Sequence, residues 1–134
     1  MHVSQKITIV RMSRPSRKNI NQELQWLGTS LGLFSTRDKD RSCYRIFLEL
    51  LKAAKMQKSL TSDELAARSK LSRGTVVFHL NKLIQAGIIV ASKNKYILRV
   101  DKLEHLIQEI RKDLQRTMDD LQDVAEDIDK WLGL

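Results

Sequence analysis

The sequence of 134 residues has few of the residue types that form cross-links, bind metals or stack on bases. Its single cysteine, Cys43, cannot form an intrachain disulfide, which fits a reducing compartment such as the cytoplasm. Aromatic residues make up only 5% of the chain, too few for a platform that stacks on single-stranded nucleic acid. No apolar run approaches the roughly 18 residues of a membrane-spanning helix, so we expect no membrane contact.

The chain also lacks a catalytic constellation. The histidines at positions 2, 79 and 105 have no metal-ligand spacing, and there is no C-x-x-C pair. The five glycines are scattered and form no phosphate-binding loop. We therefore expect no enzyme, no metal site and no cofactor, and Cys43 is expected to be a small buried hydrophobe.

Charge is distributed unevenly along the chain. Residues 1–100 hold 19 Lys and Arg against 6 Asp and Glu, a net charge of +13. Residues 101–134 hold 5 Lys and Arg against 10 Asp and Glu, a net charge of −5. A basic body followed by an acidic segment is typical of a polyanion-binding protein whose last element faces away from the polyanion. A merely soluble basic protein would explain the charge alone equally well.

Two short helices and a hairpin are predicted between residues 61 and 100. Thr61 and Glu64 form an S/T-x-x-E capping box that starts the first helix. Ser72 caps a second helix that ends before Gly87, where a left-handed residue is favoured. The order is that of a helix-turn-helix.

A two-stranded hairpin follows the second helix. Residues 88–91 are apolar and mostly β-branched, residues 92–95 form a polar turn, and residues 96–100 alternate as a returning strand. Leu60 is a candidate for a short third strand of this hairpin. The hairpin corresponds to a wing with a basic tip.

The second helix has two different faces when its residues are mapped at 100° per residue. Its predicted core stripe consists of Val76, Leu80, Leu83 and Ile84, with Val77 at the edge. The opposite side carries Thr75, Phe78, Lys82 and Gln85, with Arg73 and Gly74 in the first turn. No acidic residue occurs between Ser72 and Val100, whereas an ordinary solvated face mixes both signs. The outer face is therefore small, basic and partly apolar.

The segment LSRGTVVFHLNKLIQAGIIV resembles the recognition helix and first wing strand of winged helix-turn-helix transcription regulators, most closely the ArsR-like and MarR-like group. The resemblance covers residues 38–100. It implies that the helix at 72–86 enters the major groove of double-stranded DNA and that the wing at 92–95 touches the flanking backbone. The residues that it assigns to DNA contact are Ser72, Arg73, Gly74, Thr75, Phe78, His79, Lys82, Gln85, Lys93, Asn94 and Lys95.

One departure from this pattern concerns two apolar positions. Many relatives carry polar residues where this chain has Val77 and Phe78. Phe78 could pack on a thymine methyl group, or another element of this protein could cover it. His79, on the flank of the helix, is expected to be structural or to contact phosphate. Lone Cys43 does not supply the paired cysteines by which several ArsR relatives sense metals.

The first helix of the winged domain is predicted at residues 38–58. Its apolar stripe comprises Tyr44, Phe47, Leu48, Leu51 and Ala54, widened by Ile46 and Leu50. Asp38 or Asp40 can cap its start, and Lys52, Lys55 and Lys58 lie at its end, where the helix dipole favours cations.

Residues 101–134 carry a heptad seam on a predicted long helix. The seam consists of Leu103, Ile107, Ile110, Leu114, Thr117, Leu121, Val124, Ile128 and Trp131, at alternating spacings of four and three. A small winged domain cannot bury such a seam, so we expect a homodimeric coiled coil rather than a helix folded back on its own domain. Asp113, Asp120 and Asp127 flank the seam, and facing like charges would disfavour antiparallel pairing in register. A strip of Met118, Ala125 and Leu132 on the other flank suggests a further partner.

That further partner is predicted to be an amphipathic helix within residues 19–37. Its stripe is Ile20, Leu24, Leu27, Leu31 and Phe34, with Asn19 as cap and Gly32 at the end. Residues 1–18 form a basic arm in which Val3, Ile7 and Ile9 alternate weakly, as in a short strand. Arg11, Arg14, Arg17 and Lys18 could track phosphate or the minor groove, or belong to a disordered solubilising tail.

The predicted fold class is mainly α with a small β-hairpin wing, an α+β winged helix-turn-helix domain with a long C-terminal helix. The leading function is a cytoplasmic, homodimeric, sequence-specific regulator of transcription that binds double-stranded DNA. The alternative is a winged-helix protein–protein interaction module of a transcription or chromosome complex. The sequence has no signature for an effector ligand, for the target sequence or for activation as opposed to repression.

Overall fold

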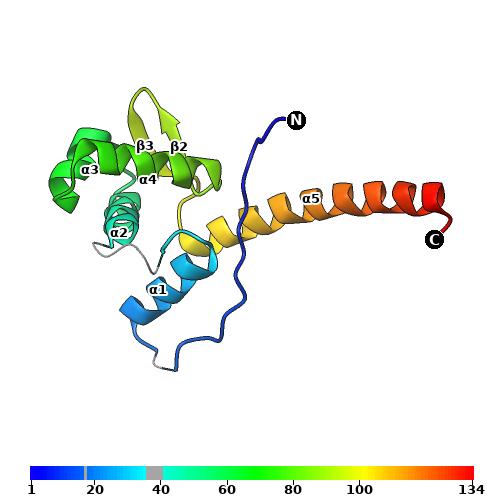
Figure 1. Cartoon of the computed structure of the whole chain (residues 1–134). Helices are drawn as coiled ribbons and strands as arrows, with labels where there is room; N and C mark the ends of the chain where they lie inside the picture. Colours follow the sequence, from blue (N-terminus) through cyan, green and yellow to red (C-terminus); the bar gives the residue numbers. More distant parts are fainter. Residues whose placement is uncertain (17, 36–40) are drawn as a thin grey trace.

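The computed structural model describes residues 1–16, 18–35 and 41–134. Four shorter helices and a small sheet gather at one end of the molecule, and one long helix projects away from them (Figure 1). In chain order the elements are α1 (Ile20–Ser30), α2 (Ser42–Lys55), β1 (Leu60–Thr61), α3 (Ser62–Ser69), α4 (Arg73–Gln85), β2 (Ile89–Ser92), β3 (Lys95–Leu98) and α5 (Leu103–Leu132). The α+β class predicted from the sequence is confirmed. None of the described helices is long and apolar enough to cross a membrane.

Helix α2 is shorter than predicted at both ends. It begins at Ser42, with Arg41 as an N-cap in the left-handed region and without a side-chain capping bond. The proposed caps Asp38 and Asp40 lie outside the described residues. The helix ends at Lys55 because Gln57 adopts a positive φ of 54°.

The buried face of α2 is also rotated from the predicted stripe. Its buried side chains are Ser42, Cys43, Ile46, Phe47, Leu50 and Ala53. The predicted stripe residues Tyr44, Leu48, Leu51 and Ala54 are only partly buried against this core. The face turns because α3, α4 and β3 all contact α2, so its centre lies between them. Cys43 is 1% exposed, as expected for a small buried hydrophobe.

Helix α3 is fixed by the predicted capping box. The Thr61 hydroxyl accepts from the Glu64 backbone N–H at 3.0 Å, and the Glu64 carboxylate accepts from the Thr61 N–H at 3.1 Å. The hydrogen bond from the Thr61 backbone lowers the pKa of the Glu64 carboxyl. The helix ends at Ser69, and the next residue, Lys70, has a φ of 57° that turns the chain towards α4.

The sheet has three antiparallel strands in the order β1-β3-β2. Leu60 pairs with Tyr96, so the predicted short third strand is confirmed. Strands β2 and β3 pair from Ile89–Leu98 to Ser92–Lys95. The sheet therefore holds the hairpin against α2 and α4 and leaves its tip outside the core.

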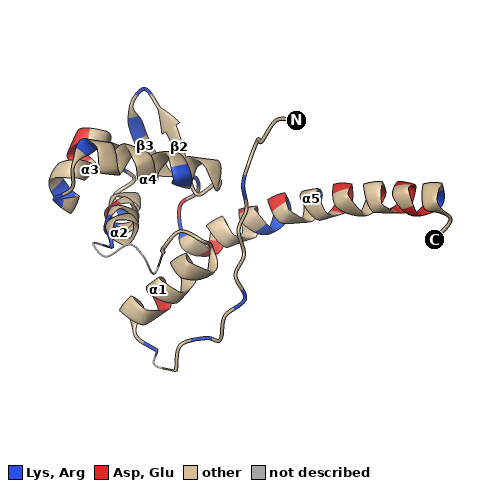
Figure 2. Ribbon diagram, viewed as in Figure 1, with Lys and Arg blue, Asp and Glu red and all other residues tan. Residues whose placement is uncertain are grey.

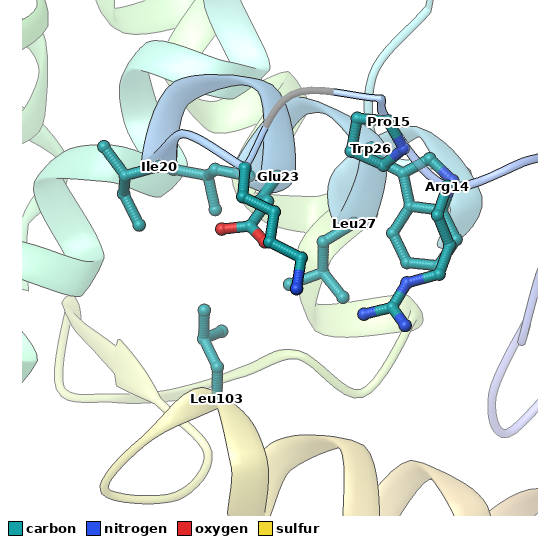
Figure 3. Close-up of a pocket in the computed structure, with 9 residues that line it drawn as sticks. Arg14, Pro15, Ile20, Glu23, Trp26, Leu27 and Leu103 are labelled. Carbon is teal, nitrogen blue, oxygen red and sulfur yellow. The ribbon is translucent and has the colours of Figure 1, made fainter.

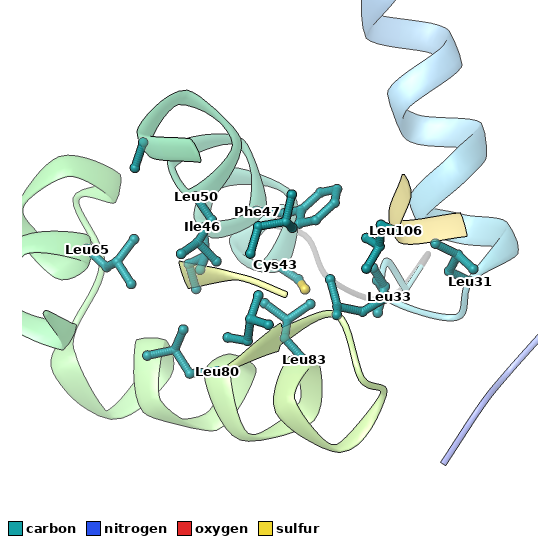
Figure 4. Close-up of a cluster of buried hydrophobic side chains, with 14 of the residues drawn as sticks. Leu31, Leu33, Cys43, Ile46, Phe47, Leu50, Leu65, Leu80, Leu83 and Leu106 are labelled. Carbon is teal, nitrogen blue, oxygen red and sulfur yellow. The ribbon is translucent and has the colours of Figure 1, made fainter. Parts of the chain in front are cut away.

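One hydrophobic core joins these elements (Figure 4). Phe47 on α2, Leu65 on α3, and Leu80 and Leu83 on α4 are at most 1% exposed. Leu106 of α5 reaches the same core at 0% exposure. The core therefore fixes α4 and the root of α5 in one body.

Helix α1 follows the sequence prediction closely. The Asn19 side chain accepts from the Gln22 N–H at 2.8 Å, and Gly32 has a φ of +70° just after the helix. Leu24 and Leu31 are buried, but Ile20 is 78% exposed, so the start of the predicted stripe is open. The remaining stripe residues, Leu27 and Phe34, pack partly against the core.

The N-terminal arm is extended and forms no strand at residues 3–9. Its backbone is nevertheless anchored, because Lys6 N–H donates to the Gln85 carbonyl at 3.0 Å and Val10 N–H donates to the Ser30 carbonyl at 2.7 Å. The arm therefore lies against the ends of α4 and α1. Arg17 lies outside the described residues.

Asp113 of α5 forms a polar cluster with residues from three segments. It is 4% exposed and accepts from Arg99 Nη1 at 2.6 Å and from Gln5 Nε2 at 2.9 Å, and Arg116 also donates to it. The hydrogen bond from Arg99 lowers the pKa of the Asp113 carboxyl, and Asp113 in turn raises the pKa of Arg99. Asp113 therefore differs from Asp120, which shares its predicted place beside the seam but is exposed.

Helix α5 has two halves with different surroundings. In the first half Leu106 and Ile110 are buried in the chain's own core, and Leu103, Ile107 and Leu114 are half-buried. Every residue from 115 to 134 is exposed. Ile110 is thus not free for the predicted seam, because the helix turns this side towards its own domain.

Candidate nucleic-acid interface

The turn between α3 and α4 places the start of α4 on the surface. Ser72 is the N-cap, and its hydroxyl accepts from the Thr75 N–H at 3.2 Å. Leu71 is half-buried and its N–H donates to the Ala66 carbonyl, which ties the turn to α3. The first turn of α4 is therefore fixed by Ser72 and contains no acidic residue of its own.

The inner face of α4 is confirmed for three of its four predicted residues. Val76, Leu80 and Leu83 are at most 1% exposed. Ile84 is 37% exposed, which corrects its placement in the core stripe. Ile84 instead lines a shallow groove together with Gln5 of the arm, because the end of α4 meets the arm rather than the core.

The outer face of α4 is open at its N-terminal half. The Arg73 side chain is 73% exposed, Phe78 is 67% exposed, and a Cβ at Gly74 would meet nothing within 4 Å. No element among the described residues covers Phe78, so its ring is open to a partner. His79 is half-buried beside Phe78, with the rings edge to face at 5.1 Å.

The C-terminal half of this face meets the arm. Lys82 is half-buried, and its ammonium donates to the Leu33 carbonyl at 3.2 Å. It lines a hollow of about 420 Å³ shared with Phe78, Gln85 and Lys6. Two lysines from distant parts of the sequence therefore border the same hollow.

The wing is a tight hairpin with a basic tip. Lys93 and Asn94 both have positive φ, 51° and 64°, which is the geometry of a two-residue type I′ turn. These two residues and Lys95 are exposed. Figure 2 shows the basic colour at this tip and near the end of α4, while acidic residues gather along the far half of α5.

The ion pairs of this region leave its cations available. Arg73 lies 3.7 Å from Asp63 of α3, but both side chains are more than 70% exposed. Such a surface pair contributes about 0–1 kcal/mol and is screened by salt. A phosphate could therefore replace Asp63 as the partner of Arg73 at little cost.

Two contributors to this surface were not predicted. Asn81 is exposed and lines the hollow beside Phe78 and Lys82, and the helical map would have placed it on the same face. Lys6 comes from the arm, and no local pattern indicates where an extended arm docks. Among the described residues, no group of three or more His, Cys, Asp or Glu could hold a metal ion.

Comparison with known proteins agrees with this geometry. The family model for winged helix-turn-helix DNA-binding domains matches residues 48–90, which run from within α2 into β2. Searches of curated proteins and of solved structures found no match. The match does not separate the ArsR-like from the MarR-like group. The chain therefore carries a winged helix-turn-helix domain of the DNA-binding class.

Proposed function

We propose that the protein is a homodimeric transcriptional regulator that binds double-stranded DNA sequence-specifically, with α4 in the major groove and the wing on the flanking backbone. One observation carries the proposal. The exposed residues of α4 and the wing form a surface without a single acidic side chain, on a domain of a DNA-binding family. Such a surface attracts phosphate, whose counterions are released on binding.

The proposed contacts divide by their chemistry. Arg73, Lys93 and Lys95 would contact phosphate and position the domain, whereas Thr75 and Phe78 face outward where base edges would lie. Lys82 would have to leave the Leu33 carbonyl, which costs one charge-assisted hydrogen bond of about 1.5–3 kcal/mol. The contact set keeps Ser72, Gly74, His79, Gln85 and Asn94 from the sequence prediction and adds Asn81 and Lys6.

Self-association is the second part of the proposal. The far half of α5 exposes Leu121, Val124, Ile128 and Trp131 by 50% to 90%. Contiguous apolar surface of this kind marks an interaction site in a soluble protein. The proposed seam therefore runs from half-buried Leu103, Ile107 and Leu114 to Trp131 and omits Ile110. A cytoplasmic location is part of the proposal and rests on the lone buried Cys43.

The rival function is a protein-docking module, which the 67% exposure of Phe78 favours. A salt titration of duplex binding separates the two. For a DNA-binding protein, log K falls linearly with log[salt] with a slope near −0.9 per neutralised phosphate. No duplex binding at low salt, or an affinity independent of salt, would contradict the proposal and favour the docking module.

A further inference from the structure

A pocket of about 370 Å³ opens between α1 and the start of α5 (Figure 3). Its lining is mainly apolar and includes Ile20, Leu24, Trp26 and Leu27 of α1, Pro15 of the arm and Leu103 of α5. Figure 3 shows Leu103 pointing from α5 towards α1. Leu103 is the first residue of the α5 seam, so the pocket is continuous with the surface proposed for self-association.

The rim of this pocket is mostly basic. Arg14 and Lys18 line it from the arm and the segment before α1, and Glu23 is its one acidic residue. An occupant that fits must offer a large apolar group together with negative charge. The far end of α5 has this combination.

The last turns of α5 are both apolar and acidic. Trp131 is 90% exposed and Leu132 is 68% exposed. Residues 117–134 contain six Asp and Glu against one Lys, whereas residues 101–116 contain four of each sign. The whole net charge of −5 of the C-terminal segment therefore lies on its projecting half, close to Trp131.

The spacing of the seam fixes which residues meet. Thr117 is the middle residue of the seam, with Leu103 fourteen residues before it and Trp131 fourteen residues after it. Two helices that run antiparallel and cross at Thr117 therefore bring Trp131 of one copy level with Leu103 of the other. Parallel helices in register would instead set Trp131 against Trp131.

Charge distinguishes the two orientations further. Parallel pairing sets two halves of charge −5 side by side, and like charges along a helix pair repel. Antiparallel pairing sets each acidic half beside a neutral half and beside Arg14 and Lys18. Repulsion among the aspartates that flank the seam was expected to disfavour this orientation. Asp113 does not contribute to that repulsion, because it is buried, pairs with Arg99 and has exposed Arg116 as a second partner.

We propose that two copies of the chain pair antiparallel through α5 and that Trp131 of each copy fills the pocket beside Leu103 of the other. This inference rests on the proposed self-association and specifies its orientation and contact site. It places α1 in the dimer interface, since five of the residues that line the pocket belong to α1.

The orientation is tested by distances between spin labels in the full chain with Cys43 replaced by alanine. Asp119→Cys and Lys130→Cys place labels at exposed positions on the same side of α5. Antiparallel pairing about Thr117 puts the two residues at 119 within about 6 Å of each other along the axis, and the two at 130 about 39 Å apart, at 1.5 Å per residue. Helix content and duplex binding of the Cys43→Ala chain confirm that it folds.

The outcomes distinguish self-association itself from the antiparallel orientation of the two helices. A short distance at 119 with a long one at 130 supports antiparallel pairing. Short distances at both positions mean a parallel dimer, which overturns the inference and leaves self-association intact. A monomeric mass in sedimentation, without any distance between labels, overturns self-association and the inference together.

The pocket is tested separately by Trp131→Ser, with Leu134→Ser as the matched control. Both residues are exposed near the end of α5, but Leu134 lies off the seam. Burial of a large apolar side chain predicts that Trp131→Ser raises the dimer dissociation constant about tenfold to a hundredfold, while Leu134→Ser changes it less than about twofold. Equal effects of the two substitutions would overturn the assignment of Trp131 to the pocket.

Discussion

The outer face of α4 and the far half of α5 both expose apolar side chains, but their charges are opposite. Phe78 lies among Arg and Lys residues on a surface that has no acidic residue from Ser72 to Val100. The seam from Leu121 to Trp131 lies among six acidic residues and one lysine. Apolar exposure alone therefore does not identify the partner of a surface. The surrounding charge differs between the two surfaces, and it favours the proposed polyanion at α4 and the proposed second copy at α5.

The two surfaces also differ in how they are held. The core fixes α4 through Val76, Leu80 and Leu83, whereas every residue of α5 beyond Leu114 is exposed. The outer face of α4 is therefore held in place before any ligand binds. The projecting helix has an apolar stripe that no described residue of the same chain buries, in line with the proposed self-association.

The largest effect is expected from charges placed in the α5 seam. Leu121→Asp combined with Ile128→Asp puts four carboxylates into the proposed dimer interface and should raise the dissociation constant on the order of a thousandfold. Sedimentation equilibrium measures this change. Gln122→Asp, next to Leu121 but off the seam, adds one negative charge per chain, half that of the double substitution, and should leave the dimer intact. A dimer that survives the double substitution would contradict the seam.

The next largest effect is expected on DNA affinity, from substitutions in the outer face of α4. Arg73→Ala combined with Lys82→Ala should lower the affinity for a selected duplex about a hundredfold, since each contact contributes about 1–3 kcal/mol. The dimer should be unchanged. Lys112→Ala removes an exposed lysine paired with Glu109 on α5 and should leave DNA binding unaltered. Equal losses in the two proteins would mean that overall charge, not the α4 face, determines binding.

A smaller effect is expected at Asp113, where α5 meets the rest of its own domain. Asp113→Asn weakens the bonds from Arg99 and Gln5 and should lower the free energy of unfolding by about 2 kcal/mol at pH 7. Because the folded pKa of Asp113 is lowered, the unfolded chain binds more protons near its own pKa of about 3.9. The stabilisation is therefore present above that pKa and is lost as the pH falls through the folded value.

Urea denaturation at pH 7 and pH 3 measures this difference. The gap between the wild type and Asp113→Asn should shrink at pH 3. Asp120→Asn, one heptad further along and exposed, should cost less than about 0.5 kcal/mol at either pH. Similar costs at positions 113 and 120 would show that the buried cluster does not stabilise the fold.

The smallest effect concerns Phe78. Phe78→Ala should change stability by less than about 0.5 kcal/mol, because the side chain is 67% exposed. It should lower duplex affinity by about fivefold to tenfold, and most for sites with a thymine under the ring. Ile84→Ala, on the same helix but facing the arm, serves as the control. An unchanged affinity for every duplex would assign Phe78 to protein docking instead.

Local features of the fold could be predicted from sequence because their causes are local. The Thr61 capping box, the Ser72 cap and Gly87 with a φ of +80° each involve atoms within a few residues. The same holds for Asn19 at the start of α1. Short-range hydrogen bonds and backbone preferences decide these positions without reference to the rest of the chain.

The errors arose where distant segments meet. Ile84 is partly exposed and Lys82 is partly buried because the arm and the loop after α1 lie against the end of α4. Asp113 is buried because Arg99 and Gln5 reach it from two other segments. Helical periodicity gives the direction in which a side chain points from its own helix. It does not show which other segment of the chain lies in that direction.

Binding-site selection from a random duplex library, with the purified full chain, tests whether two copies of α4 and the wing bind DNA as a pair. We expect enrichment of a two-fold symmetric sequence with half-sites about 10 base pairs apart or a multiple of that spacing. Enrichment of a single unpaired half-site would contradict the paired arrangement. Failure to enrich any sequence at low salt would contradict sequence-specific DNA binding itself.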